Sequence, residues 1–305
     1  MDGTFLLQQL VNGLTLGSVY ALIALGYSMV YGILKLLNFA HGEVYMFGAF
    51  IGWFVLVGLG GPEDLAVPVA VALMLMFLAA MLGSGILGVL VERFAYRRLR
   101  NAPRIAPLIT ALGVSFFLQS TALLLFGPRF RSYSTFEFLG GAVTVAGVRI
   151  SYTRILVVVA AIVLMLALTW LVGRTTLGKA MRATAFDREA AAMMGIDVDR
   201  VIVATFLIGS VLAGAAGVMF GLVFFSVFHL MGFMAGLKGF TAAVVGGIGS
   251  IPGAMLGGLL IGLAEAFSAG YISSTFQDLI VFSILIAVLL FRPTGLLGKA
   301  DIRKV

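Results

Sequence analysis

Long apolar segments separated by short polar stretches dominate this sequence. A run of roughly 20 apolar residues matches the length of a helix that crosses a bilayer. We expect nine such segments, of which the second, seventh and eighth are short and rich in glycine. These three are expected to be discontinuous or re-entrant helices, which are tolerated at membrane depth only where protein or water covers them. The predicted segments are Phe5–Tyr31, Val44–Leu59, Ala66–Val91, Ile105–Phe126, Ile155–Val172, Val201–Phe228, Ala235–Ile248, Gly253–Phe267 and Leu279–Phe291.

The longest polar stretch, Gly173–Arg200, lies between two of these segments. Apolar and charged positions alternate in it so as to predict an amphipathic helix over Leu177–Met194, and Gly195 supplies a stop signal. A short helix with one apolar and one polar face is suited to docking a soluble partner. The alternative is a helix that lies on lipid headgroups, but Asp187 and Glu189 dilute the positive charge that lipid binding favours.

Gly173 to Lys179 fits the spacing of a phosphate-binding loop. The next residue is Ala180, where that loop needs a hydroxyl for the metal ion, and an apolar span stands in place of the preceding strand. Gly295–Lys299 is a weaker match with the same defects. If ATP drives this protein, we expect another chain to bind it.

The composition excludes an ordinary soluble domain. The chain is 61% hydrophobic and 11% charged, with a mean hydropathy of +1.14, whereas about a quarter of the residues of soluble domains are charged. The absence of Cys excludes disulfides and thiol catalysis, and His41 and His229 are too far apart in sequence to suggest a metal pair. No nucleophile and base lie at usable spacing, so we expect neither an enzyme nor a bound cofactor. The class expected is an all-α integral membrane protein whose partners include lipid and no nucleic acid.

Three basic clusters, within 93–104, 174–200 and 292–304, mark cytoplasmic segments. An odd number of spans puts all three on one face, so nine spans are favoured over eight, with the N-terminus outside and the C-terminus inside. The loop Gly127–Tyr152 then faces outward, and the alternation in Gly140–Ile150 predicts a short hairpin.

Two parts of the chain resemble each other. Gly17–Ala24 matches Gly209–Ala216 at five of eight positions. The odd number of intervening spans would invert one copy relative to the other. We therefore expect one permease domain with a first repeat near 5–126, a linking span at 155–172, a polar helix near 177–196 and a second repeat near 201–291. Inverted repeats with broken helices are typical of transporters, whose sites lie near the midplane.

The most unusual polar residues of the first half begin the second segment. Asn38 is expected to cap the helix that follows and leave N–H groups for a carboxylate. Gly42 permits close backbone approach, and Glu43 is suited to an ammonium group. The alternative is that His41 and Glu43 satisfy each other or nearby backbone. Ionisable groups inside membranes favour the pathway interpretation.

Lys238 and Gly239 are the expected counterparts in the second half. Glu265, Gln277 and Asp278 are expected to solvate helix ends. Glycines spaced four residues apart are expected to mark helix contacts rather than chemistry. These pairs are Gly13 and Gly17, Gly217 and Gly221, Gly253 and Gly257, and Gly258 and Gly262.

Two runs, Leu36–Ala49 and Arg182–Asp197, resemble the signatures of bacterial ABC permeases for branched-chain amino acids, of the LivH type. With Arg292–Leu296 and the span order, the resemblance covers nearly the whole chain. It implies an inner-membrane permease that works by alternating access with a second homologous permease, two ATP-binding subunits and a periplasmic binding protein. It also implies that the polar loop enters a groove on the ATPase, with contacts carried by Arg182, Asp187, Glu189, Ala190 and Gly195.

Two alternatives stay open at the level of sequence. One is an ion-coupled secondary transporter or channel, for which Glu43 is the only serious candidate for a buried ion site. The other is an ABC permease for urea, short amides or other amino acids, because selectivity in this class rests largely with the binding protein.

Overall fold

Apolar helices dominate the chain in the computed structural model, which describes residues 3–61, 64–100, 102–103, 105–133 and 140–298. Eight helical segments among these residues are long and apolar enough to cross a membrane. The expected all-α, polytopic class is therefore confirmed. The helices are α1 (Gly3–Leu34), α2 (His41–Gly58), α3 (Val69–Val91), α4 (Ile105–Phe126), α5 (Tyr152–Arg174), α6 (Thr176–Phe186), α7 (Arg188–Met193), α8 (Val198–Phe224), α9 (Met231–Gly246), α10 (Ile251–Tyr271) and α11 (Gln277–Phe291).

The lengths of three helices correct or refine the expectations. The segment expected at Gly253–Phe267 is not broken: α10 is one continuous helix of 21 residues. α2 has 18 residues because its helix already begins at His41, whereas α9, with 16, is shorter than the eight spanning segments, as expected. The non-helical backbone precedes α2 and α9, at 35–40 and 225–230, and is not inside them.

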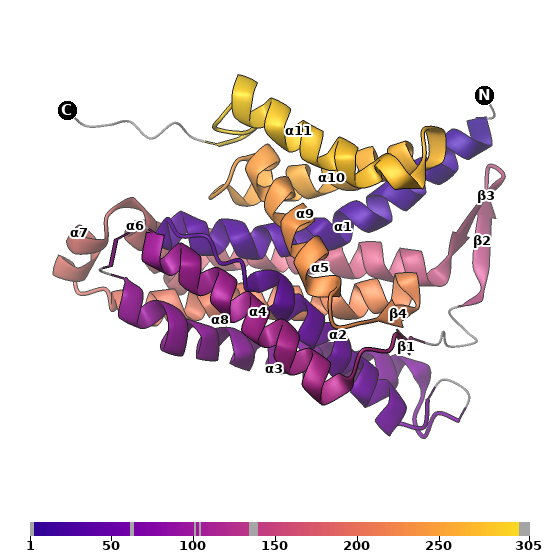
Figure 1. The fold of residues 1–305 in the computed structure, drawn as a ribbon, viewed down its shortest axis with the longest axis horizontal. Helices are drawn as coiled ribbons and strands as arrows, with labels where there is room; N and C mark the ends of the chain where they lie inside the picture. Colours follow the sequence, from indigo (N-terminus) through magenta and orange to yellow (C-terminus); the bar gives the residue numbers. More distant parts are fainter. Residues whose placement is uncertain (1–2, 62–63, 101, 104, 134–139, 299–305) are drawn as a thin grey trace.

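The two ends of the molecule carry different elements (Figure 1). Thr4, near the start of α1, lies against Gly147 in the turn of the hairpin. At the other end of α1, the carbonyl of Ile33 accepts hydrogen bonds from Arg188 of α7, and the chain after α11 packs on the end of α9 through a hydrogen bond from Leu296 N to Val245 O of 2.9 Å. The N-terminal end and the hairpin thus lie opposite α6, α7 and the end of α11.

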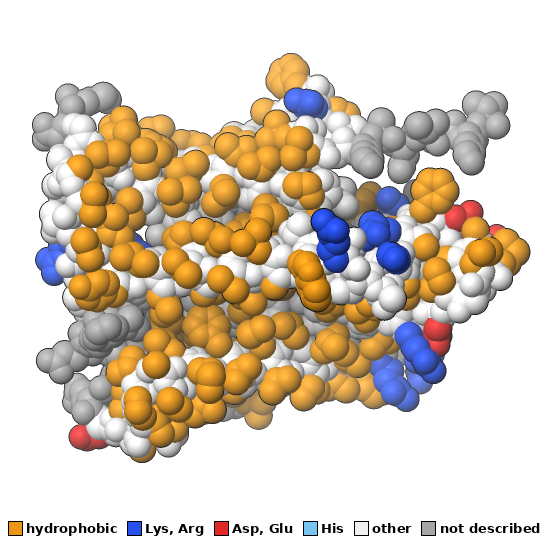
Figure 2. Space-filling model, turned by 180° about the vertical axis from the view of Figure 1, so that it is seen from behind, with side chains coloured by type: hydrophobic (Ala, Val, Ile, Leu, Met, Phe, Trp, Pro, Cys, Tyr) orange, Lys and Arg blue, Asp and Glu red, His pale blue; other side chains and the backbone are white. Residues whose placement is uncertain are grey.

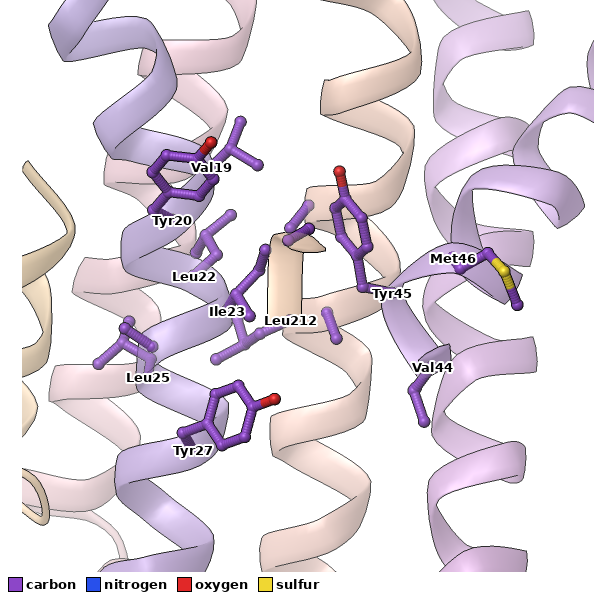
Figure 3. Packing of buried hydrophobic residues seen from close by; sticks show 14 of the residues in the cluster. Val19, Tyr20, Leu22, Ile23, Leu25, Tyr27, Val44, Tyr45, Met46 and Leu212 are labelled. Carbon is purple, nitrogen blue, oxygen red and sulfur yellow. The ribbon is translucent and has the colours of Figure 1, made fainter. Parts of the chain in front are cut away.

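Helices α1, α2 and α8 form the centre of the bundle. Of their most apolar windows, 83%, 61% and 72% of residues are buried, against 6% for the last spanning segment, 274–291. Figure 3 shows the side chains of Tyr20, Tyr27 and Tyr45 packed among apolar neighbours in this core. The outer helices turn apolar side chains outward, and Figure 2 shows such side chains over most of one face, with Lys and Arg gathered mainly toward the end that carries α6 and α7. That distribution is expected of a bundle solvated by lipid.

Small residues let α1 and α10 approach at backbone distance. A Cβ added to Gly17 would lie 2.8 Å from the Cα of Leu259 and 3.0 Å from the carbonyl oxygen of Gly258, while one on Gly258 or Gly262 would overlap the backbone of α1. The sequence expectation that these glycines serve packing is confirmed.

Helices of the first half, α1–α4, pack extensively on helices of the second half, α8–α11. α1 packs mainly on α10, the third helix of the second half, and α8 packs on α3, the third helix of the first half. α2 packs on α8, and α9 on α1. Each half therefore completes the core of the other, and neither buries its apolar faces alone.

Short strands close the end opposite α6 and α7. β2 (Ala142–Val145) pairs antiparallel with β3 (Val148–Ser151) around a turn at Ala146 and Gly147, so the expected hairpin is confirmed. β1 (Arg131–Ser132) pairs with β4 (Ser226–Val227) and ties the loop after α4 to the loop before α9. The part of the expected outer loop at 134–139 lies outside the described residues, as do Arg104 and the basic residues beyond 298.

The polar stretch after α5 forms two helices, so the single helix expected over Leu177–Met194 is wrong. Asp187 leaves helical geometry, with φ −154° and ψ 116°, and its side chain accepts a hydrogen bond from the backbone N–H of Ala190 over 3.0 Å. Asp187 thus ends α6 and caps α7, as a short side chain with an acceptor does at an N-cap. Gly195 has φ +83° and follows the last turn of α7, so the expected stop is confirmed.

Candidate functional site

The loop between α1 and α2 carries the first candidate residue, Asn38. The residue before α2 is Ala40, and no side chain caps this helix, so the expected cap by Asn38 is wrong. Its side-chain oxygen instead accepts a hydrogen bond of 3.0 Å from the hydroxyl of Tyr96. Tyr96 lies in a π-helical turn, Glu92–Tyr96, that extends α3 and brings the ring to the loop. Asn38 is therefore a buried anchor between the loop and α3.

His41 is the first residue of α2 and is 1% exposed. Its ring stands edge-on to that of Tyr27, with centroids 4.9 Å apart, and its Nε2 lies where a side chain on Gly26 would be. Nε2 has no hydrogen-bond partner among the described residues. The glycine in α1 thus makes the room that the imidazole occupies.

Gly42 brings the start of α2 against the start of α9. A Cβ at Gly42 would overlap the carbonyl oxygen of Gly232 and lie 2.8 Å from the Cα of Gly236. The first turns of the two shorter inner helices therefore meet inside the bundle, and this contact needs glycine on both sides.

Glu43 is fully buried and points toward α4. Its Oε1 accepts hydrogen bonds from the Ser115 hydroxyl, 3.0 Å away, and from the Gln119 amide, 2.9 Å away. Its Oε2 lies beside Gly232 and accepts no hydrogen bond from the described residues. Sequence reasoning missed Ser115 and Gln119. Their four-residue spacing, which puts two polar side chains on one face of an apolar helix, was the available signal.

Lys238 forms a second buried polar centre. Its Nζ lies 2.8 Å from Oε1 of Glu265 on α10 and 2.7 Å from Oδ1 of Asp278 on α11. Glu265 is only 5% exposed, so the expectation that it solvates a helix end is wrong; α11 covers that end and the ion pair replaces water. Asp278 keeps 39% of its side chain exposed, so it both pairs with Lys238 and contacts solvent at the helix end. Gly239, the neighbour of Lys238, packs on Ile23 of α1.

The predicted pathway residues thus fall into two groups. Asn38, His41, Gly42 and Glu43 gather where α2 meets α1, α3, α4 and α9. Lys238 turns to α10 and α11 and pairs with other partners than Glu43. α9 contributes to both groups, through Gly232 and through Lys238.

The residues expected at a docking surface lie on α6, α7 and the turns around them. Arg182, Asp187, Glu189 and Gly195 are exposed, and Ala190 is half-buried. Arg182 donates a hydrogen bond to the carbonyl of Val172 at the end of α5. Three large apolar side chains beside them, Phe186, Met193 and Met194, are 87%, 81% and 82% exposed. The surface combines charge with uncovered apolar area, as protein interfaces do.

Arg188 connects this surface to the core. Its Nε and Nη2 donate hydrogen bonds of 3.1 and 2.6 Å to the backbone carbonyl of Ile33, one residue before the end of α1. Burial and, secondarily, the charge of Arg100 lower the pKa of Arg188 from its usual range. The same residues border a cavity of about 360 Å³ between the α6–α7 junction, the α1–α2 loop, the loop after α3 and the start of α4.

Charged side chains fasten the neighbouring loop after α3. Arg97 pairs with Asp199 at 2.8 Å, and Arg100 pairs with both Asp199 and Glu92.

Among the residues that the structure describes, no group of three or more His, Asp or Glu side chains is placed to hold a metal ion.

Comparison with known proteins places these features in a family. Residues 9–289 match the family model described as branched-chain amino acid transport system, permease component. The chain is 46% identical over 302 residues to the high-affinity branched-chain amino acid transport system permease protein BraD of Pseudomonas aeruginosa, covering 98% of each chain. It is 43% identical over 306 residues to the corresponding LivH of Escherichia coli, covering 99% of this chain and 98% of the relative.

A more distant similarity covers part of the chain. The autoinducer 2 import system permease protein LsrC of Yersinia pseudotuberculosis is 29% identical over 138 residues, 43% of this chain and 39% of that protein. The near-complete matches at higher identity decide the assignment: the chain belongs to the family of branched-chain amino acid transport permeases.

Proposed function

We propose that this chain is a transmembrane permease subunit of an ATP-driven importer of branched-chain amino acids. The observation that carries the proposal is the similarity to BraD and LivH, which spans 98% or more of this chain. The permease carries no cofactor of its own in this proposal, and ATP is hydrolysed on partner subunits.

The N-terminus and the β2–β3 hairpin face the periplasm, and α6, α7 and the C-terminus face the cytoplasm of a bacterial cell. The basic residues support this orientation, because Arg97, Arg100, Arg182 and Arg188 all belong to the end with α6 and α7. Positive charge near span ends is retained in the cytoplasm.

α6 and α7 dock an ATPase subunit. Phe186, Met193 and Met194 supply the exposed apolar contact area. The contact with the ATPase is carried by Arg182, Asp187, Glu189, Ala190 and Gly195, of which the first three are charged. Buried apolar anchors inside a polar rim are the general pattern of stable interfaces. The cap by Asp187 sets the angle between α6 and α7 and hence the shape presented to the groove.

Movement of α7 reaches the pathway through Arg188. This side chain holds the end of α1, and α1 leads through residues 35–40 to Asn38, His41, Gly42 and Glu43. With Lys238 and Gly239, these are the residues we assign to the substrate pathway, because buried ionisable groups beside non-helical connections inside a membrane bundle mark transport sites. A second homologous permease completes the pathway, and a periplasmic binding protein delivers substrate.

The test is purification of the tagged chain from its native membrane, with mass spectrometry of the proteins that accompany it, for the native chain and for Glu189→Arg. We expect a second permease and ATP-binding subunits with the native chain and loss of the ATPases from the variant. Arg149→Glu, a charge reversal on the exposed hairpin strand β3, is the matched control and should keep the ATPases.

Radiolabelled leucine uptake then separates the ABC mechanism from ion coupling. Uptake should stop when cellular ATP is depleted and persist when the ion gradients are collapsed at constant ATP. Purification of the chain alone, together with uptake that follows the ion gradient, would contradict the proposal.

A further inference from the structure

A cavity of about 410 Å³ opens among α1, α5, α8, α10 and α11 at the end of the molecule that carries the hairpin. Pockets for small ligands have volumes of roughly 300–1,000 Å³. Apolar side chains such as Leu16, Val223 and Ala266 line the cavity together with Gln9, Arg154 and Glu265. It is therefore a mixed surface with one acidic and one basic side chain.

The acidic wall has an unused acceptor. Glu265 is 5% exposed; its Oε1 pairs with Lys238, and its Oε2 accepts no hydrogen bond from the described residues. Lys238 also pairs with Asp278, which does not line this cavity. The Tyr20 hydroxyl interacts with the Glu265 carboxylate electrostatically and as a weak side-chain hydrogen-bond donor, short of a full bond to Oε2. A buried carboxylate oxygen without a full hydrogen bond is costly, and a cationic ligand group in the cavity would satisfy it after a rotation of the Glu265 side chain, which borders the cavity.

The basic wall is Arg154, in the first turn of α5. One of its nitrogens donates to the side-chain oxygen of Asn12 on α1, and the planar guanidinium has further donors in a geometry that fits a carboxylate. Arg154 and Val223 also line an adjoining cavity of about 350 Å³ that extends to Arg149 in β3. The two cavities together lead from the hairpin to Glu265.

We propose that this cavity is an outward-facing site for the zwitterionic head of a free aliphatic amino acid, with the carboxylate on Arg154 and the ammonium on Glu265. The aliphatic side chain lies against the apolar wall formed by Leu16, Val223 and Ala266. Opposite charges on two walls select a zwitterion over an amine or an acid of the same shape, because either of those leaves one charged wall without a counter-charge from the ligand. The proposal rests on the proposed function, since it names where that substrate first meets this chain.

The test uses the assembled transporter in intact cells and exploits the absence of Cys from this chain. Ala269 is exposed and lines the cavity, so Ala269→Cys should react with a membrane-impermeant maleimide added outside. Millimolar leucine should slow the reaction several-fold. Isoamylamine, which lacks the carboxylate, and 4-methylpentanoate, which lacks the ammonium, should not. Val223→Cys provides a second reporter position, and Thr144→Cys, on the exposed hairpin, should react without protection by leucine.

Two pairs of variants in the Ala269→Cys background assign the contacts. Glu265→Gln and Arg154→Gln should each abolish protection and lower leucine uptake at least tenfold. Asp278→Asn removes the other carboxylate from Lys238 without touching the cavity, and Arg149→Gln neutralises a neighbouring basic residue; both should keep protection. Equal loss in Glu265→Gln and Asp278→Asn would overturn the site and leave the cluster a purely structural one.

The outcomes also separate this proposal from the proposed function. If the native complex imports leucine but neither reporter is protected, or the amine protects as well as leucine does, the site is wrong and the proposed function stands. If the native complex neither imports leucine nor is protected by it, the proposed function fails and the site fails with it.

Discussion

Lys35 and Phe225 end the two long helices α1 and α8 with the same backbone geometry. Each has left-handed φ, 54° and 56° respectively, and each donates its backbone N–H over 2.8 Å to the carbonyl four residues earlier. α2 then begins at residue 41 and α9 at residue 231, after loops of equal length. Since non-glycine residues rarely adopt this geometry, its occurrence at the ends of both long helices supports the expected correspondence between the two halves.

Aligning Lys35 with Phe225 offsets the two halves by two residues relative to the alignment that matches Gly17 with Gly209. It also pairs Gly42 with Gly232, the two glycines that contact each other where α2 meets α9. The first turns of the two shorter inner helices therefore meet at the centre of the arrangement, where a transporter with two inverted halves would place its moving parts.

Phe225 offers a test of the backbone stop. Its side chain is 49% exposed, so its replacement removes little packing. Phe225→Gly should keep or raise the stability by up to about 1 kcal/mol, because relief of the left-handed strain outweighs the added flexibility of the unfolded chain. Phe225→Val should lower it by about 1–2 kcal/mol, because β-branching is unfavourable at positive φ. Thermal unfolding of the purified complex measures both, and equal effects of the two changes would contradict the argument.

The Gly42 contact makes a prediction about assembly. Gly42→Ala puts a methyl group into the backbone of α9, so the first turns of α2 and α9 must separate, at a cost of about 1–3 kcal/mol or more. We expect a lower yield of folded protein and a lower melting temperature. Gly113→Ala is the control, because a Cβ there meets nothing within 4 Å, and it should be neutral or slightly stabilising. An unchanged melting temperature in Gly42→Ala would show that α2 and α9 can move apart here without loss of stability.

The Lys238 pair predicts a characteristic mutational pattern. Lys238→Met leaves Glu265 buried without its cation, which costs about 3–5 kcal/mol, since the paired side chains are only 9% and 7% exposed. Asp278→Asn should cost much less, because Asp278 is partly solvated. The double variant Lys238→Met, Glu265→Gln should recover most of the loss. Thermal unfolding of the three variants tests the pattern, and an additive double variant would refute it.

The sequence was sufficient to predict the bundle, because segment length and hydropathy depend on the lipid solvent alone. It also located the hairpin, whose turn residues have a local signature. The sequence did not predict the division of α6 from α7, because Asp187 also fits the pattern as a charged position on one long helix. The structure shows instead that the Asp187 side chain accepts a hydrogen bond from the backbone N–H of Ala190.

The sequence singled out Glu43 and Lys238, since ionisable residues in apolar segments are rare, but it did not provide their partners. Ser115 and Glu265 are 72 and 27 residues away from them along the chain. Only the packing of α4 on α2, and of α10 on α9, brings each pair together. Long-range pairing of this kind depends on tertiary contacts that helical periodicity does not encode.

Arg188 predicts that transport can be uncoupled from ATP hydrolysis. Its guanidinium donates two hydrogen bonds from two nitrogens to the carbonyl of Ile33 at the end of α1. Lysine has a single side-chain nitrogen and cannot reproduce this paired geometry. Loss of one charge-assisted hydrogen bond is worth about 1.5–3 kcal/mol, so Arg188→Lys should lower leucine uptake about tenfold while the ATPases still co-purify and hydrolyse ATP. Arg200→Lys, with 89% of the native side chain exposed, should transport normally. If uptake, hydrolysis and ATPase binding instead fell together, Arg188 would belong to the docking surface. If nothing changed, movement of α7 would have to reach the pathway through α6 and α8, the other helices it contacts.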